Sequence, residues 1–120
     1  MNEDQASKRK ERLAYFQTDS GSFWSHVGCR LEQAEPYHAT ISLEVQDYHL
    51  NSMRILHGGV SATLLDNVMG IAVMATRPNE KAVTTHLNIQ YVSPGHKGKV
   101  LAHADIVHMS GRTIIVQGKV

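Results

Sequence analysis

Apolar and polar residues alternate in several stretches of the chain, while one stretch is apolar almost throughout. Between Ala39 and Val45 every second residue is apolar, and this period of two predicts a strand with one buried and one solvated face. Similar patterns, with turn residues at Glu35-Pro36 and Ser110-Gly111, predict further strands. We expect these strands over residues 27–34, 83–91, 99–109 and 112–120.

Residues 59–75 form the apolar stretch, which predicts one long helix. Residues 77–79 end it, because Pro78 disfavours a helical conformation in the residue before it. The stretch is shorter than about 20 residues and contains Asp66 and Asn67, so we expect a buried helix and no membrane span. Two strands before the helix and three after it predict an α+β fold, with an antiparallel sheet and a single helix on one of its faces.

The beginning of the chain has a different pattern. Residues 4–18 are charged with scattered apolar positions, which predicts a short amphipathic helix. We therefore expect residues 1–25 to form a helical arm on a single domain that comprises residues 26–120. Phe23 and Trp24 would either anchor this arm to the core or line an acyl pocket.

Composition narrows the classes of function. The chain has 120 residues, 42% of them hydrophobic and 19% charged, which is typical of one globular domain. Its 12 basic and 11 acidic residues leave a net charge of +1, so the sequence predicts no nucleic-acid partner. Cys29 is the only cysteine and the first twelve residues contain no apolar run, which together favour a cytoplasmic location.

One face of the predicted helix carries Thr63, Asp66, Asn67 and Gly70, a polar and small stripe on an otherwise apolar cylinder. A carboxylate among apolar neighbours costs stability unless it is paired or open to a cleft. The stripe therefore indicates a functional Asp66. The alternative interpretation is an aspartate on the solvated face of an amphipathic helix.

Residues 57–59, His-Gly-Gly, stand directly before the helix. Two glycines let a ligand approach the backbone, and the N–H groups of a first helical turn favour negative charge; a tight turn would explain them equally well. Eight helical residues rise about 12 Å, so one chain cannot easily supply both Gly58 and Asp66 to one reacting carbonyl. Two antiparallel helices of a symmetric dimer could bring these groups together. Uncovered sheet edges and the apolar helix independently predict dimerisation.

Four segments carry a resemblance to a known family. Residues 49–51 (HLN), 56–60 (LHGGV), 65–67 (LDN) and 87–94 (LNIQYVSP) resemble the hotdog-fold acyl-CoA thioesterases. The similarity is to the branch with the phenylacetate-pathway enzyme and the mammalian thioesterase superfamily members. It implies a five- to six-stranded antiparallel sheet wrapped around one long central helix, over residues 27–120. Members usually have a further strand after the one at 112–120, so this sheet could be one strand short.

The resemblance also implies roles for individual residues. The Gly58 N–H and the Asn51 side chain would bind the carbonyl region, and His57 would orient the loop or the thioester. Asp66 would act as nucleophile or general base, and Thr84 stands where relatives carry a hydroxyl that positions water. Substrate-binding residues are expected at Gly59, Asn67, Ser93, Pro94, Lys97 and Lys99. The cations expected near the coenzyme A phosphates are Arg54, Arg77, Lys97, Lys99 and Arg112, which could equally be solvated loop charges.

The predicted function is hydrolysis of an aromatic or medium- to long-chain acyl-CoA by a homodimer or homotetramer with sites at the subunit interface. No cofactor is expected, since coenzyme A is part of the substrate. The alternative is a non-catalytic hotdog module that binds acyl-CoA or acyl-carrier protein. No metal site is expected, because His103 and His108 are an odd number of residues apart and face opposite sides of a strand. We expect surface or interface positions for His26, His38, His49, His96, His103 and His108.

Overall fold

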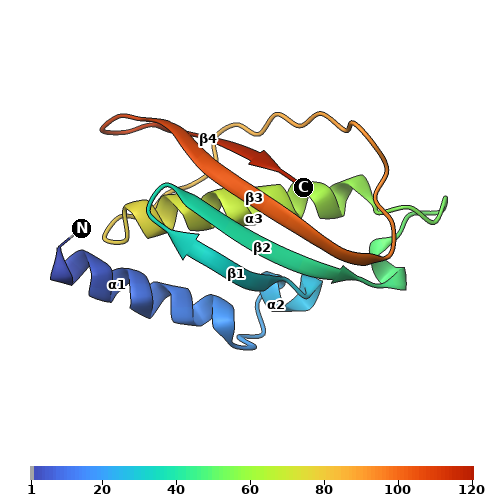
Figure 1. Cartoon of the computed structure of the whole chain (residues 1–120), viewed down its shortest axis with the longest axis horizontal. Coiled ribbons are helices and arrows are strands. Elements are labelled where there is room, and N and C mark those ends of the chain that lie inside the picture. Colours follow the sequence, from blue (N-terminus) through green and yellow to red (C-terminus); the bar gives the residue numbers. More distant parts are fainter. Residues whose placement is uncertain (1) are drawn as a thin grey trace.

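The fold is a four-stranded antiparallel sheet with one long helix packed on one face, seen in a computed structural model that describes residues 2–120 (Figure 1). The strands follow the order β1-β2-β3-β4 across the sheet. Their bounds are β1 Arg30–Glu35, β2 His38–Val45, β3 Gly98–Met109 and β4 Ile114–Lys119. The helices are α1 Glu3–Ala14, α2 Phe23–Val27 and α3 Gly58–Thr76, with short 3₁₀ turns at Tyr15–Gln17 and Asp47–His49. The predicted α+β class is confirmed.

Alternation along β2 builds the core between the sheet and α3. Ile41 and Leu43 are 0% and 1% exposed, and they pack in one cluster with Leu64 and Val68 of α3. β2 pairs with β3 without interruption from His38↔Asp105 to Val45↔Gly98. Apolar and polar residues alternate over 39–45 and 99–109 because these residues form two paired central strands. Their side chains point in turn toward α3 and away from it.

Helix α3 confirms the helix expected over residues 59–75, with one more residue at each end. Its buried residues lie along the side that faces the sheet and are Leu64, Val68, Ile71, Ala72, Met74 and Ala75. The length and apolar composition of α3 would also satisfy a membrane span. In this fold they are explained by the sheet that the helix covers.

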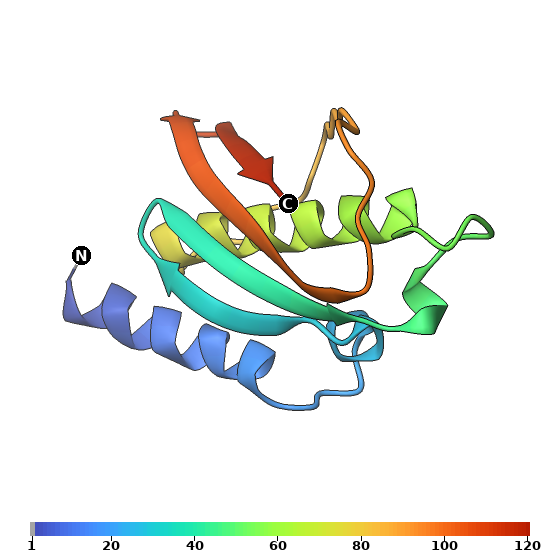
Figure 2. The same ribbon diagram turned by 45° about the vertical axis from the view of Figure 1, so that its right-hand side comes forward.

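The strand expected over residues 83–91 is wrong, and the sheet has four strands where five or six were expected. Residues 81–97 form an extended segment that passes along α3 on the side of β4 (Figures 1 and 2). Within residues 2–120, no backbone N–H of residues 83–92 donates to another backbone group. A strand is defined by its hydrogen-bonded neighbour, and this segment has none within its own chain.

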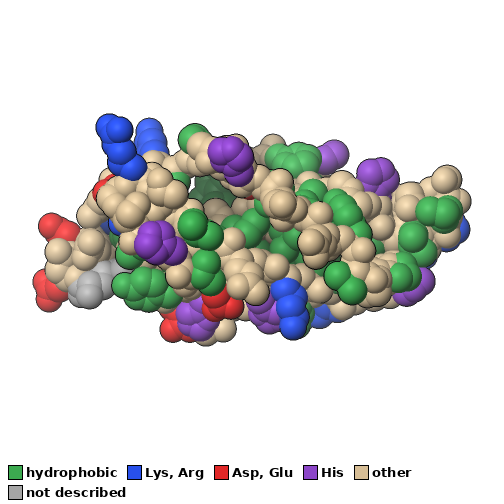
Figure 3. All heavy atoms as spheres, turned by 90° about the horizontal axis from the view of Figure 1, so that it is seen from above, with side chains coloured by type: hydrophobic (Ala, Val, Ile, Leu, Met, Phe, Trp, Pro, Cys, Tyr) green, Lys and Arg blue, Asp and Glu red, His purple; other side chains and the backbone are tan. Residues whose placement is uncertain are grey.

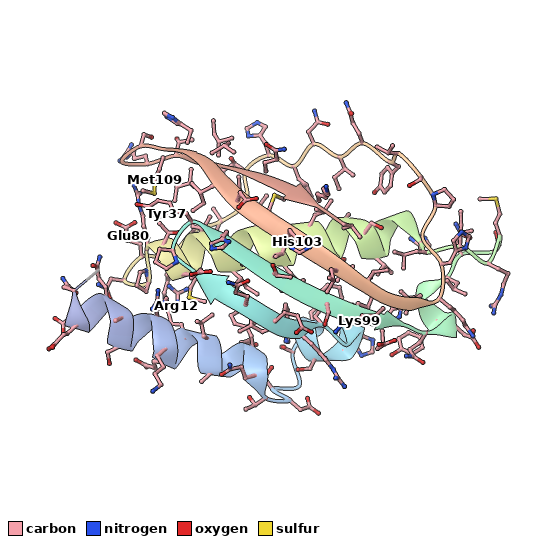
Figure 4. All side chains as sticks on the ribbon, viewed as in Figure 1. Arg12, Tyr37, Glu80, Lys99, His103 and Met109 are labelled. Carbon is pink, nitrogen blue, oxygen red and sulfur yellow. The ribbon has the colours of Figure 1, made fainter. Side chains whose placement is uncertain are left out.

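The N-terminal arm is tied to the domain at two places. Trp24 is 5% exposed and lies in the core cluster with Ile41 and Leu43 of β2. Within the arm, its indole N–H donates to the Phe16 carbonyl at 3.2 Å. Arg12 of α1 donates to the carbonyls of Pro78 and Glu80 at 2.9 Å each. Arg12 and Glu80 are both labelled in Figure 4. Trp24 is thus the expected anchor, whereas Phe23 is 63% exposed and anchors nothing.

Candidate active site

The N-terminus of α3 is capped by a histidine ring. His57 Nδ1 accepts a hydrogen bond from the Gly59 N–H at 2.8 Å, and the His57 carbonyl accepts from Val60 and Ser61 at 2.9 and 3.3 Å. Because Nδ1 accepts, the proton of a neutral imidazole sits on Nε2, where it can donate to a ligand. Within residues 2–120 the Gly58 N–H has no acceptor. This N–H is therefore the donor that the first turn leaves open.

Packing explains both glycines of this turn. A Cβ at Gly59 would lie 3.0 Å from His57 Nδ1, so a side chain there would displace the cap. A Cβ at Gly58 would lie 3.2 Å from Cε1 of Tyr91, whose ring fills that space. The sequence left two reasons open for the two glycines, ligand approach and a tight turn, and these contacts add a packing reason.

Asp66 lies in the middle of α3 on the side away from the sheet. Its Oδ1 accepts a hydrogen bond from the Thr84 hydroxyl at 2.7 Å, so the structure brings together two residues expected in the site. One turn further along α3, no heavy atom would lie within 4 Å of a Cβ at Gly70. At Gly70 the stripe is thus open to the exterior of the chain, where it can face a ligand or another subunit.

Asn51 shapes the loop that leads into α3. Its Oδ1 accepts from the backbone N–H groups of Met53 and Ile55 at 2.9 and 3.3 Å, and a β-bridge joins Leu50 to Leu56. Within residues 2–120 the side-chain amide nitrogen donates to no group, which leaves it available to a carbonyl. Asn51 is therefore held at the neck of the loop by its oxygen, with its donor side open.

His49 and Asn67 have internal partners. His49 was expected at the surface or an interface, and this is wrong: it is 3% exposed, donates from Nε2 to the Val27 carbonyl at 2.7 Å, and accepts at Nδ1 from Gln46. Asn67 donates from Nδ2 toward Cys29 Sγ at 3.8 Å, so the structure does not bring its amide to Asp66 and Thr84. Burial raises the pKa of the Cys29 thiol.

The expected phosphate-binding cations lie in three places. Lys97 and Arg54 flank Asp47 at 2.5 and 3.0 Å, and they lie near the start of α3 because the Leu56 N–H donates to the Gly95 carbonyl. Hydrogen bonds from Lys97 and then Arg54 hold the pKa of Asp47 below its usual value. Ser93 and Pro94 are exposed in the same loop.

Arg77 and Arg112 lie at the other end of α3. Arg77 donates to the carbonyls of Ser110 and Gly111 at 2.6 and 3.1 Å and pairs with Glu80, so its guanidinium is held by groups of its own chain. Arg112 follows in the same β3–β4 turn, and α3, with 19 residues, spans roughly 27 Å from Gly58 to this end within one chain. Lys99 of β3 pairs with Glu32 of β1 at 3.4 Å. Lys99 lies toward the opposite end of the molecule from Glu80 (Figure 4).

Sequence reasoning missed Tyr91, which it placed in a strand. The Tyr91 hydroxyl donates to the Gly58 carbonyl at 2.9 Å. Nothing in the pattern of residues 87–94 distinguishes this tyrosine from its neighbours, because the contact joins positions 33 residues apart. For metals, no group of three His, Cys, Asp or Glu side chains gathers within residues 2–120.

Comparison with known proteins identifies the family of the chain. The family model of the thioesterase superfamily matches residues 53–120. Human acyl-coenzyme A thioesterase 13 is 32% identical over 84 residues, which cover 70% of this chain and 60% of that protein. A 1,4-dihydroxy-2-naphthoyl-CoA hydrolase of Listeria monocytogenes is 26% identical over 95 residues, which cover 78% and 77%. The chain thus matches about 60% of the length of acyl-coenzyme A thioesterase 13.

Solved structures show the same fold. A conserved protein of Pseudomonas aeruginosa superposes with a TM-score of 0.77 and 25% identity, covering 81% of this chain and 79% of that one. Zebra fish thioesterase superfamily member 2 superposes with a TM-score of 0.74 and 23% identity, covering 91% and 92%. With the match over residues 53–120, these similarities establish that the chain has the hotdog fold and belongs to the thioesterase superfamily.

Proposed function

We propose that the chain is an acyl-CoA thioesterase that uses Asp66 and the Gly58 N–H. The observation that carries the proposal is the pair of open groups on α3. The Gly58 N–H lacks an acceptor within residues 2–120, and the Asp66 carboxylate is held by Thr84 on the uncovered side of the helix. One group can stabilise an oxyanion, and the other can attack a carbonyl or activate water.

Thioester hydrolysis needs little more than these two groups. The leaving thiol has a pKa near that of cysteine, about 8.5, so its thiolate departs without a strong acid. As general base, Asp66 removes a proton from water, the hydroxide attacks the carbonyl carbon, and the C–S bond breaks to give the acid and coenzyme A. As nucleophile, it displaces the thiolate to form a mixed anhydride, which water then hydrolyses. His57 Nε2 and the Asn51 amide can add hydrogen bonds to the carbonyl oxygen.

Two chains are needed for one such site. α3 is continuous from Gly58 to Thr76, and eight residues of it span about 12 Å, beyond the reach of one carbonyl. The face that carries residues 81–97 and β4 has hydrophobic side chains gathered along its middle (Figure 3), and Val83, Tyr91 and Val92 are more than half exposed. A second copy on this face would cover these side chains and set its own Asp66 opposite Gly58 of the first.

The proposed substrates are aromatic or medium- to long-chain acyl-CoAs. Arg54 and Lys97 lie near the start of α3, where they can meet the phosphates of coenzyme A when the thioester carbonyl is at Gly58. The apolar side chains along the uncovered face fit an acyl group better than a charged one.

The test is release of free thiol from a graded panel of acyl-CoAs. Cys29 is buried, so a thiol reagent reports on coenzyme A. We expect turnover by the wild type and a loss of about 100- to 10,000-fold in kcat for Asp66→Asn. Asp105→Asn, the same change on β3, is the control and should keep full activity. Tight binding of acyl-CoA without turnover, unchanged by Asp66→Asn, would instead indicate the non-catalytic module.

A further inference from the structure

Gly58 is held by hydrogen bonds on both sides. Two peptide groups flank it, and they carry four polar atoms. The His57 carbonyl accepts from Val60 and Ser61, and the Gly59 N–H donates to His57 Nδ1. The Gly58 carbonyl accepts from the Tyr91 hydroxyl at 2.9 Å, which leaves the Gly58 N–H as the one of the four without a partner in residues 2–120.

Tyr91 also supplies the surface against which Gly58 rests. Its Cε1, Cζ and Oη would lie 3.2 to 3.4 Å from a Cβ at Gly58, so the ring takes the place of the missing side chain. Glycine has more backbone freedom than any other residue, and this contact restricts it from a direction that the helix itself does not cover. The ring and the hydroxyl therefore act on the same residue in two different ways.

We propose that Tyr91 is a positioning residue that sets the direction of the Gly58 N–H toward the reacting carbonyl. This inference rests on the proposed thioesterase function. Tyr91 acts through Gly58 and does not touch the thioester: the hydroxyl fixes the peptide after Gly58, and the ring fixes its Cα. An oxyanion donor contributes most when its direction is set before the negative charge develops.

The test uses Tyr91→Phe, which keeps the ring and removes the hydroxyl. We expect kcat to fall about three- to tenfold, the size of effect that one neutral hydrogen bond has, with KM unchanged. Tyr91→Ala removes both contacts and should lower kcat on the order of 100-fold, as a misplaced catalytic group does. Tyr37→Phe is the matched control, because it makes the same change at the far end of α3 (Figure 4).

A second readout does not depend on turnover. In ¹⁵N-labelled protein, Tyr91→Phe should shift the Gly58 amide resonance and Tyr37→Phe should not. Wild-type kcat in Tyr91→Phe, or an unmoved Gly58 resonance, would overturn the role of Tyr91. Failure of the proposed function is a different result: the wild type would hydrolyse no acyl-CoA in the panel, whatever the Gly58 resonance does.

Discussion

At the scale of residues, Thr84 holds the carboxylate of Asp66 from a segment that belongs to no sheet. A hydroxyl that donates to a carboxylate contributes roughly 1.5–3 kcal/mol. We expect Thr84→Val, which removes the hydroxyl and keeps the shape, to lower kcat about 10- to 100-fold. Thr84→Ser should stay within about threefold of the wild type. Steady-state kinetics on the best acyl-CoA of the panel measure both.

Thr85→Val is the control for this prediction. Successive side chains of an extended segment point to opposite sides, so Thr85 faces away from Asp66. Wild-type kcat in Thr84→Val would show that Asp66 works without this hydroxyl.

Individual site residues were predictable where the local pattern was unusual. Asp66 stood out because folding gives no reason for a carboxylate in an apolar helix, and Gly58 because it opens that helix. Tyr91 and His49 were not predictable. Tyr91 contacts Gly58, which lies 33 residues earlier in the chain. His49 is buried with its Nε2 on the Val27 carbonyl, 22 residues earlier.

At the scale of elements, one glutamate joins three strands. Glu32 lies at a bulge of β1, where its carboxylate accepts from Ser42 of β2 at 2.7 Å and pairs with Lys99 of β3. The hydrogen bond from Ser42, and then the charge of Lys99, lower the pKa of Glu32 from its usual 4.5. A carboxylate whose pKa is lowered by folding stabilises the fold above pH 4.5, and this contribution disappears as the pH falls through the folded value.

We therefore expect the thermal midpoint of Glu32→Gln to be below that of the wild type at pH 6. The difference should shrink as the pH is lowered from 4.5 to 3, which circular dichroism melts can follow. Glu44→Gln makes the same change on β2 without touching Ser42 and should lack this pH-dependent difference. A gap between Glu32→Gln and wild type that is the same at pH 6 and pH 3 would contradict the role of the ionised carboxylate.

Elements were predictable wherever their partners are in the same chain. β2 and β3 alternate as expected, because each has a paired neighbour on both sides and a helix over one face. Residues 83–91 alternate in the same way but form no strand here. A period of two shows that a segment can pair and does not show what it pairs with, so alternation alone overestimated the number of strands.

At the scale of the whole molecule, the separation of Gly58 and Asp66 along α3 predicts a complementation experiment. Asp66→Ala and Asn51→Ala should each be inactive alone. In a heterodimer of the two, one site combines the intact loop of the first chain with the intact Asp66 of the second, and the other site has lost both. After subunit exchange, half of the dimers are mixed and half of their sites are intact, so we expect about a quarter of wild-type activity.

The control mixes Asp66→Ala with the double variant Asp66→Ala, Asn51→Ala, where no combination of chains restores Asp66. This mixture should stay inactive, which excludes a general effect of mixing. Native mass spectrometry of chains with different mass tags counts the mixed dimers, so that the activity can be expressed per mixed dimer. Full exchange without recovered activity would place each site within one chain, and α3 would then have to bend to bring Asp66 near Gly58. Recovery close to a quarter requires no such bend, because a continuous helix in each of two chains supplies the two halves of every site.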